Sequence, residues 1–135
     1  APACTVDFYK EYYAPRLGRR RRNAPVVRIP SLNIYNLNEE LELDDNVVLA
    51  YRKSLLYLVS RALEKERDKP ILGMQKYSKE ITGPNFFYSG NKNSITKSTS
   101  HGGFDNDPDT LNHMMKNILG KAPKKPFTSD EMKGY

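Results

Sequence analysis

The clearest pattern of apolar and polar positions lies between Val47 and Arg67. Apolar side chains recur there at steps of three and four residues, which places them on one stripe of a helix. The stripe consists of Val48, Tyr51, Leu55, Leu58 and Ala62, widened by Leu56, Val59 and Leu63. The pattern predicts an amphipathic helix over 47–67, which Asp45 or Asn46 can cap. Asp68-Lys69-Pro70 ends it, because proline disfavours helix at the residue before it.

A second helix is predicted over 108–119. Asp107 suits the N-cap, Pro108 fits the first turn, and Asp109 favours the positive end of the helix. The apolar stripe consists of Leu111, Met114, Met115, Ile118 and Leu119. Gly120 follows as a left-handed terminator.

Three short segments are candidate strands. Residues 26–29 (Val-Val-Arg-Ile) form a β-branched run, and residues 33–37 (Asn-Ile-Tyr-Asn-Leu) alternate polar and apolar side chains, so either can be a strand. Residues 71–74 (Ile-Leu-Gly-Met) predict a short buried strand. Elsewhere the pattern predicts a short helix over 6–13, an acidic connector over 38–46, a long loop over 82–99 and an exposed tail over 121–135.

The predicted order is strand, acidic turn, helix, strand, histidine-bearing loop and helix. An α/β-hydrolase ends in this order, and its triad follows the chain as nucleophile, acid and histidine. We therefore expect an α/β fold class. The chain would be the C-terminal portion of an α/β-hydrolase fold, with short parallel strands and flanking helices, completed by another chain or a missing segment.

His101 is the candidate catalytic histidine. It stands in a glycine-rich turn ahead of a helix, where an exposed imidazole can act as a general base. The other histidine, His113, lies inside the helix over 108–119 and is expected to pack or to point to solvent. A triad also needs a carboxylate that orients the imidazole and stabilises the imidazolium. Asp45, directly before Asn-Val-Val, matches that role best and Asp44 is the alternative, although Asp45 can instead simply cap the helix over 47–67.

Three segments carry a resemblance to a known family. They are residues 43–47 (Leu-Asp-Asp-Asn-Val), residues 51–60 (Tyr-Arg-Lys-Ser-Leu-Leu-Tyr-Leu-Val-Ser) and residues 99–107 (Thr-Ser-His-Gly-Gly-Phe-Asp-Asn-Asp). Together they resemble the C-terminal part of bacterial α/β-hydrolase lipases, nearest to the lipase effectors of type VI secretion systems. The resemblance covers 26–120 and leaves a basic, aromatic segment over 1–25 and the tail over 121–135. It implies a Ser-Asp-His hydrolase of phospholipids, secreted into a rival bacterial cell and neutralised by an immunity protein.

The chain departs from that family in lacking a Gly-x-Ser-x-Gly nucleophile elbow. We expect another polypeptide segment to supply the nucleophile and the rest of the sheet, and the chain alone to be inactive, because triad members act as a unit. Cys4 with His101 and Asp45 would be a cysteine triad, but no glycine-rich elbow surrounds Cys4. His-Gly-Gly also occurs in the oxyanion loop of some lipases, but there it precedes the nucleophile.

The distribution of charge suggests a second, different function. The chain of 135 residues has a net charge of +6, and much of the excess lies at Arg16, Arg19, Arg20, Arg21 and Arg22. Such a cluster attracts phosphates, so the alternative is a non-catalytic basic module that binds nucleic acid or anionic lipid. Because the arginines are confined to one predicted loop, the pattern favours the hydrolase, and nucleic acid is not the expected partner.

No cofactor or metal is predicted. Two histidines twelve residues apart match no metal-ligand spacing. Residues 105–109 carry oxygen ligands, but a proline and the lack of a following Gly and Glu break the calcium-loop pattern. A single cysteine cannot form an internal disulfide, and no stretch is long and apolar enough to span a bilayer. A third possibility is a structural subunit, because two short strands cannot form a stable sheet alone.

Overall fold

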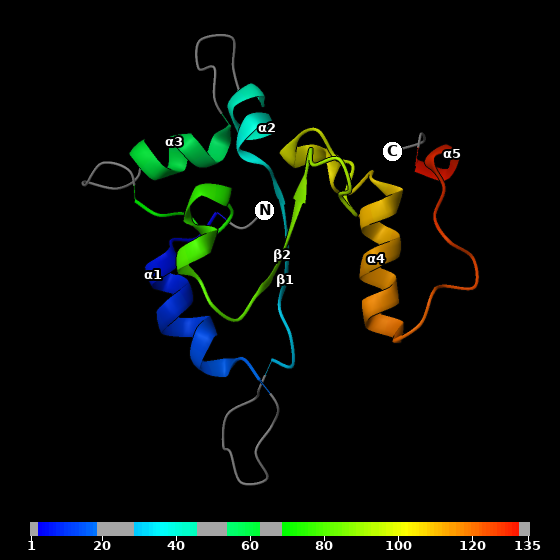
Figure 1. The fold of residues 1–135 in the computed structure, drawn as a ribbon, viewed down its shortest axis with the longest axis horizontal. Coiled ribbons are helices and arrows are strands. Elements are labelled where there is room, and N and C mark those ends of the chain that lie inside the picture. Colours follow the sequence, from blue (N-terminus) through cyan, green and yellow to red (C-terminus); the bar gives the residue numbers. More distant parts are fainter. Residues whose placement is uncertain (1–2, 19–28, 46–53, 63–68, 133–135) are drawn as a thin grey trace, which may run out of the picture.

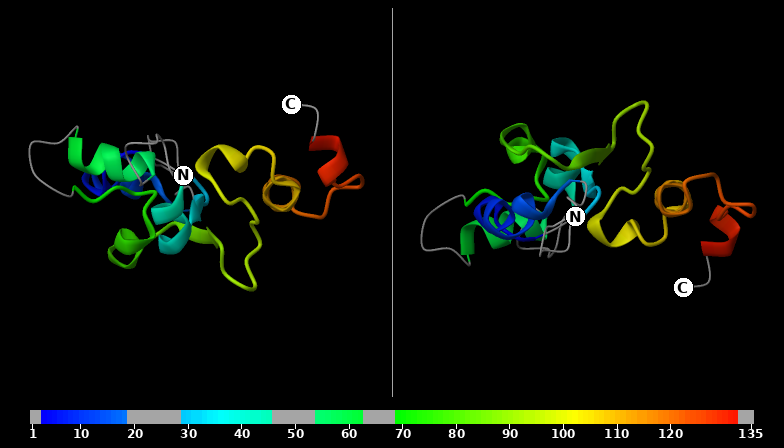
Figure 2. Two further views of the ribbon diagram at one scale, coloured as in Figure 1. Left: turned by 90° about the horizontal axis from the view of Figure 1, so that it is seen from above. Right: turned by 90° about the horizontal axis from the view of Figure 1, so that it is seen from below.

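The computed structural model describes residues 3–18, 29–45, 54–62 and 69–132 (Figure 1). Its centre is a two-stranded parallel sheet, with helices on both sides of the strand pair. The molecule is therefore of the mixed α/β class. Figure 2 shows the last two helices on the side of the strands away from the N-terminal helices.

The two strands are β1 (Asn33–Leu37) and β2 (Asn85–Ser89), paired in parallel from Asn33↔Asn85 to Leu37↔Ser89. The predicted strand over 33–37 is confirmed. The second strand lies inside the segment that we predicted to be a long loop. Three consecutive aromatic residues (Phe86-Phe87-Tyr88) favour a strand. The Gly, Asn and Ser residues around them favour a loop, and they are more numerous.

The predicted strand over 71–74 is wrong. Ile71 forms one isolated antiparallel bridge with Thr5, and the chain then turns. Ile71 and Met74 are nevertheless buried as core residues, so the apolar run marks burial and not a strand. Residues 26–28 lie outside the described residues, and Ile29 makes a single parallel bridge with Leu17.

The helices follow the predicted positions in part. The start is helical over α1 (Val6–Phe8), η1 (Tyr9–Tyr13) and η2 (Ala14–Arg16). The others are α2 (Glu39–Asp44), α3 (Leu55–Ala62), η3 (Gln75–Glu80), η4 (His101–Gly103), α4 (Pro108–Leu119) and α5 (Ser129–Met132). α3 confirms the middle of the helix predicted over 47–67; Ser54 is not helical, and 46–53 and 63–68 lie outside the described residues. α4 has the predicted bounds, with Asp107 accepting from the Asp109 N–H and Gly120 in the left-handed region.

The acidic connector predicted over 38–46 contains a helix instead. The Asn38 side chain caps α2 by accepting from the Leu41 N–H at 2.9 Å. Glu39 and Glu40 then lie in its first turn, where negative charge is stabilised by the helix dipole. A run of acids is compatible with a connector, but Asn followed by acids is also the start of a capped helix.

The core consists of two adjoining clusters. One joins the N-terminal helix to β1 and contains Val6, Tyr9, Ile34, Leu72 and Ile81. The other places α3 against the segment after it and contains Leu56, Tyr57, Ile71 and Met74. Because residues from 6 to 81 contribute to the first cluster, the N-terminal helix is part of the support for β1.

Gly90, directly after β2, is tied to the cap of α2. It has φ +88°, and a Cβ there would stand 2.7 Å from the Asn38 amide nitrogen. We expect Gly90→Ala to lower the free energy of unfolding by about 1–3 kcal/mol, because it strains the backbone and displaces the cap. Urea denaturation measures this. Gly120→Ala is the matched control: its φ is +68°, but no atom lies within 4 Å of the added Cβ. Equal losses in both variants would contradict a role for the clash with Asn38.

Candidate functional site

The candidate site lies beyond the carboxyl ends of the two parallel strands. β1 leads into α2 and then Asp45, and β2 leads into the loop that carries His101. The Asn38 N–H donates to the Ser89 carbonyl at 3.0 Å, so the strands separate only at this point. Because the strands are neighbours and run the same way, the segments after them meet at one edge of the sheet (Figure 1).

Glu42 and His101 are in direct contact there. The Glu42 Oε1 atom lies 3.0 Å from His101 Nε2. Both atoms are buried, and although they lie close together, neither forms a hydrogen bond, with the other or with any other group in the described part of the chain. The Ser54 hydroxyl donates to the other oxygen of Glu42, Oε2. The carboxylate is thus held between a hydroxyl and an imidazole.

Glu42 is buried at a cost that its contacts must offset. Its side chain is 1% exposed, whereas the neighbouring Leu43 is 43% exposed. An unpaired carboxylate is expensive to bury, yet α2 buries Glu42 and exposes Leu43. This inversion of the usual pattern is typical of a functional site.

Asp45 also reaches His101, but through the backbone. Its Oδ2 atom accepts from the His101 N–H at 3.0 Å. Asp45 therefore fixes the position of the loop, while Glu42 contacts the ring. Asp44 is the exposed last residue of α2, and no contact joins it to His101 in the described structure.

The loop before His101 is anchored by Asp107. Its Oδ2 atom accepts from the Thr96 and Thr110 hydroxyls and from the N–H groups of Lys97 and Ser98. Burial acts to raise the pKa of the Asp107 carboxyl, but these donors outweigh it and the pKa is lowered. One carboxylate thus caps α4 and holds the segment that leads to His101.

The His-Gly-Gly turn depends on its second glycine. A Cβ at Gly103 would lie 2.6 Å from the Ser98 hydroxyl oxygen, whereas one at Gly102 would meet nothing within 4 Å. The Ser98 hydroxyl donates to the Ser100 carbonyl at 2.7 Å. Gly103 therefore lets the turn close tightly on the anchored segment.

His113 has a different environment. Its Nδ1 atom is 2.8 Å from the Tyr35 hydroxyl, and its ring lies edge-on to Phe87 with centroids 4.7 Å apart. Burial and then the charge of Lys116 lower the pKa of His113. His113 packs α4 against the strands, which is one of the two roles expected for it.

The remaining predicted residues do not join the site. Arg19, Arg20, Arg21 and Arg22 lie outside the described residues, and the Arg16 guanidinium donates to the Tyr12 carbonyl. Cys4 is half-buried, and burial raises the pKa of its thiol. Within the described ranges no cluster of three metal-ligating side chains occurs, and no helix there has the length and apolarity needed to cross a membrane.

Glu42 is the site residue that we did not predict from the sequence. It lies among other acids and does not precede Asn-Val-Val, the pattern that pointed to Asp45. The usable signal was Asn38: with Asn38 as an N-cap, residue 42 lies on the same helix face as the cap and turns inward.

The arrangement is a buried carboxylate against an imidazole, on a loop fixed by two aspartates. Such a pair can hold one tautomer of histidine and stabilise its protonated form, which is the requirement for general-base catalysis. In comparisons with known proteins, no protein-family model, no curated protein and no solved structure matches this chain.

Proposed function

We propose that this chain is the acid-and-histidine portion of a serine ester hydrolase with α/β-hydrolase topology, a lipase or phospholipase. The observation that carries the proposal is the 3.0 Å contact between Glu42 Oε1 and His101 Nε2. Its position supports the proposal too, since both residues follow neighbouring parallel strands in the order acid, then histidine. In this proposal Glu42 takes the role of the acid that we had expected of Asp45.

The roles follow from the contacts. Glu42 lies against Nε2 of His101, so in this proposal Nδ1 takes the proton from a serine hydroxyl, which reverses the roles that the two ring nitrogens have in the Ser-His-Asp triad. The serine oxygen attacks the ester carbonyl, and the imidazolium returns its proton to the departing alcohol. Water then hydrolyses the acyl-serine by the same proton transfers. Asp45 acts as a positioning residue through the backbone N–H of His101.

The serine comes from a polypeptide segment outside these 135 residues, because they contain no nucleophile elbow. The resemblance to type VI lipase effectors makes phospholipid esters the first substrates to test. On the same resemblance we propose that the protein is delivered into a target bacterium and that an immunity protein is its partner. No described contact favours the basic-module alternative, whose arginines at 19–22 lie outside the described residues.

Glu42→Gln tests the role of the acid in the protein that includes the serine. We expect kcat for a phospholipid or a p-nitrophenyl ester to fall about 10⁴-fold with KM little changed, because an amide cannot stabilise the imidazolium. Asp45→Asn is the matched control. It keeps an oxygen that accepts the His101 N–H, so we expect a much smaller loss.

The opposite ranking, with Asp45→Asn the more damaging change, would assign the acid to Asp45. Wild-type turnover in Glu42→Gln would remove the support for hydrolysis. Thermal unfolding of both variants shows whether loss of the buried charge has disturbed the fold, and Glu42→Asp, which keeps the charge, should retain part of the activity.

A further inference from the structure

Among the described residues, no strand pairs with the outer edge of β1. The Leu32 carbonyl accepts from the Asn85 N–H at 2.8 Å, and the Asn38 N–H donates to the Ser89 carbonyl at 3.0 Å. Even-numbered residues of β1 therefore direct their backbone groups toward β2. Because these directions alternate along a strand, Asn33 and Tyr35 direct theirs away from β2. No described residue hydrogen-bonds to the backbone groups of Asn33 or Tyr35 on that side.

A groove of about 560 Å³ follows this edge. Its floor is Leu32 to Tyr35, four consecutive residues that include both alternating sets, and no residue of β2 lines it. The groove therefore runs along the edge of the sheet and not over one face. Leu37, at the end of β1, is fully buried, so the accessible edge ends before it.

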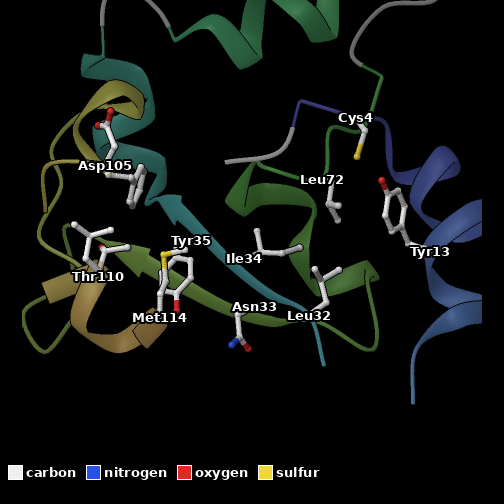
Figure 3. A pocket seen from close by; sticks show the side chains of 12 residues that line it. Cys4, Tyr13, Leu32, Asn33, Ile34, Tyr35, Leu72, Asp105, Thr110 and Met114 are labelled. Carbon is white, nitrogen blue, oxygen red and sulfur yellow. The ribbon is translucent and has the colours of Figure 1, made fainter. Parts of the chain in front are cut away.

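The two walls of the groove come from opposite sides of the sheet. Figure 3 shows Thr110 and Met114 of α4 on one side of β1, and Cys4, Tyr13 and Leu72 on the other. The wall side chains are apolar apart from Thr110, the hydroxyl of Tyr13 and the carboxylate of Asp105, which is exposed to solvent. A segment lying in the groove would meet an apolar wall on each of its faces.

We propose that this groove binds an extended segment of another polypeptide, which adds to β1 as a third strand and is apolar on both faces. The N–H and C=O groups that Asn33 and Tyr35 direct outward favour a strand, because an extended backbone can pair with all of them together. The two walls specify the side chains: a strand buried on both faces is a continuous apolar run and not an alternating one.

A second copy of the chain fits the groove less well. In a symmetric pairing of two copies through this edge, β1 itself would be the added strand, and it carries Asn33 and Asn36, whose amides would face mainly apolar walls. The docked copy would also bring its own helices on both sides of the strand. The proposed occupant is therefore a different segment, and the inference stands whether or not the site catalyses ester hydrolysis.

Hydrogen exchange of the 135-residue chain with a synthetic peptide tests the proposal. The probe is Lys-Lys-Val-Ile-Val-Ile-Val-Lys-Lys, with lysines for solubility. We expect the amides of Asn33 and Tyr35 to exchange rapidly in the chain alone and about ten-fold more slowly with saturating peptide. Two control peptides should not protect them: one N-methylated at alternate residues of the apolar run, and one with Ser in place of each Ile.

Variants of α4 separate docking from non-specific adhesion. Met114→Lys places a charge in the wall and should abolish protection. Ile118→Lys, one turn further along α4 at a residue that is 74% exposed and does not line the groove, should leave protection intact. Protection by the N-methylated or the Ser-containing peptide, or none by any peptide, would overturn the proposal. So would a dimer of the chain alone that Met114→Lys dissociates in sedimentation experiments, which would make a second copy the occupant.

Discussion

Asp107→Ala should lower the free energy of unfolding by about 3–5 kcal/mol, measured by urea denaturation. The substitution removes the shared acceptor of the Thr96 and Thr110 hydroxyls, which keep only their 2.6 Å hydrogen bond to each other, and of the N–H groups of Lys97 and Ser98. It also removes the N-cap of α4. Each unpaired buried donor carries its own desolvation cost, so the effect should exceed that of an ordinary cap.

The same carboxylate predicts how stability depends on pH. The pKa of Asp107 is lower in the folded chain than in the unfolded one, so the unfolded state binds its proton first as the pH falls. The contribution of Asp107 is therefore complete above the unfolded pKa, about 3.9, and is lost as the pH falls through the folded pKa. Acid titrations of wild type and Asp107→Asn should converge at low pH. Asp107→Asn keeps the side-chain size, so a difference that persists in acid would contradict the electrostatic explanation.

His101→Ala should reduce ester hydrolysis by about 10⁶-fold in the protein that includes the serine, because loss of the base disables the whole triad. The measurement is kcat for a p-nitrophenyl ester. His101 lies in contact with Glu42, and its side chain is 19% exposed, so truncation leaves a space near the carboxylate.

Two controls show whether His101 acts as a base or only as part of the fold. Free imidazole added to His101→Ala should restore part of the activity, since it can take up the proton in the vacated space. His113→Ala removes the other histidine, which packs α4 against Tyr35 and Phe87 of the strands. The folded variant should retain ester hydrolysis. Turnover near wild type in His101→Ala would refute the proposed function.

The parts of the fold that could be predicted are those with strong local signals. α4 combines a cap, a proline and a terminating glycine, and all three act within the helix itself. β1 alternates polar and apolar residues over its whole length. In both cases neighbouring residues determine the structure, and no distant contact is needed to find them.

β2 and Glu42 could not be predicted in the same way. The backbone groups of β2 hydrogen-bond to β1, which is distant in sequence. The local sequence around Phe86 to Tyr88 is rich in Gly and Asn and therefore predicts a loop there. The burial of Glu42 depends on Ser54 and His101, neither of them its neighbour in sequence. Asp45 was expected to orient the His101 ring, whereas in the structure it accepts from the His101 backbone N–H, a difference that the local pattern could not show.

The parallel pairing of β1 with β2 has a kinetic consequence. Asn33 is 52 residues from Asn85, its partner in the sheet. A contact of such long range forms only after much of the chain has become ordered, which slows folding. The acid and the histidine follow different strands of this pair, so neither strand alone can position them. We therefore expect the imidazole to meet its carboxylate late in folding, and a nascent or partly unfolded chain to lack the assembled Glu42–His101 pair.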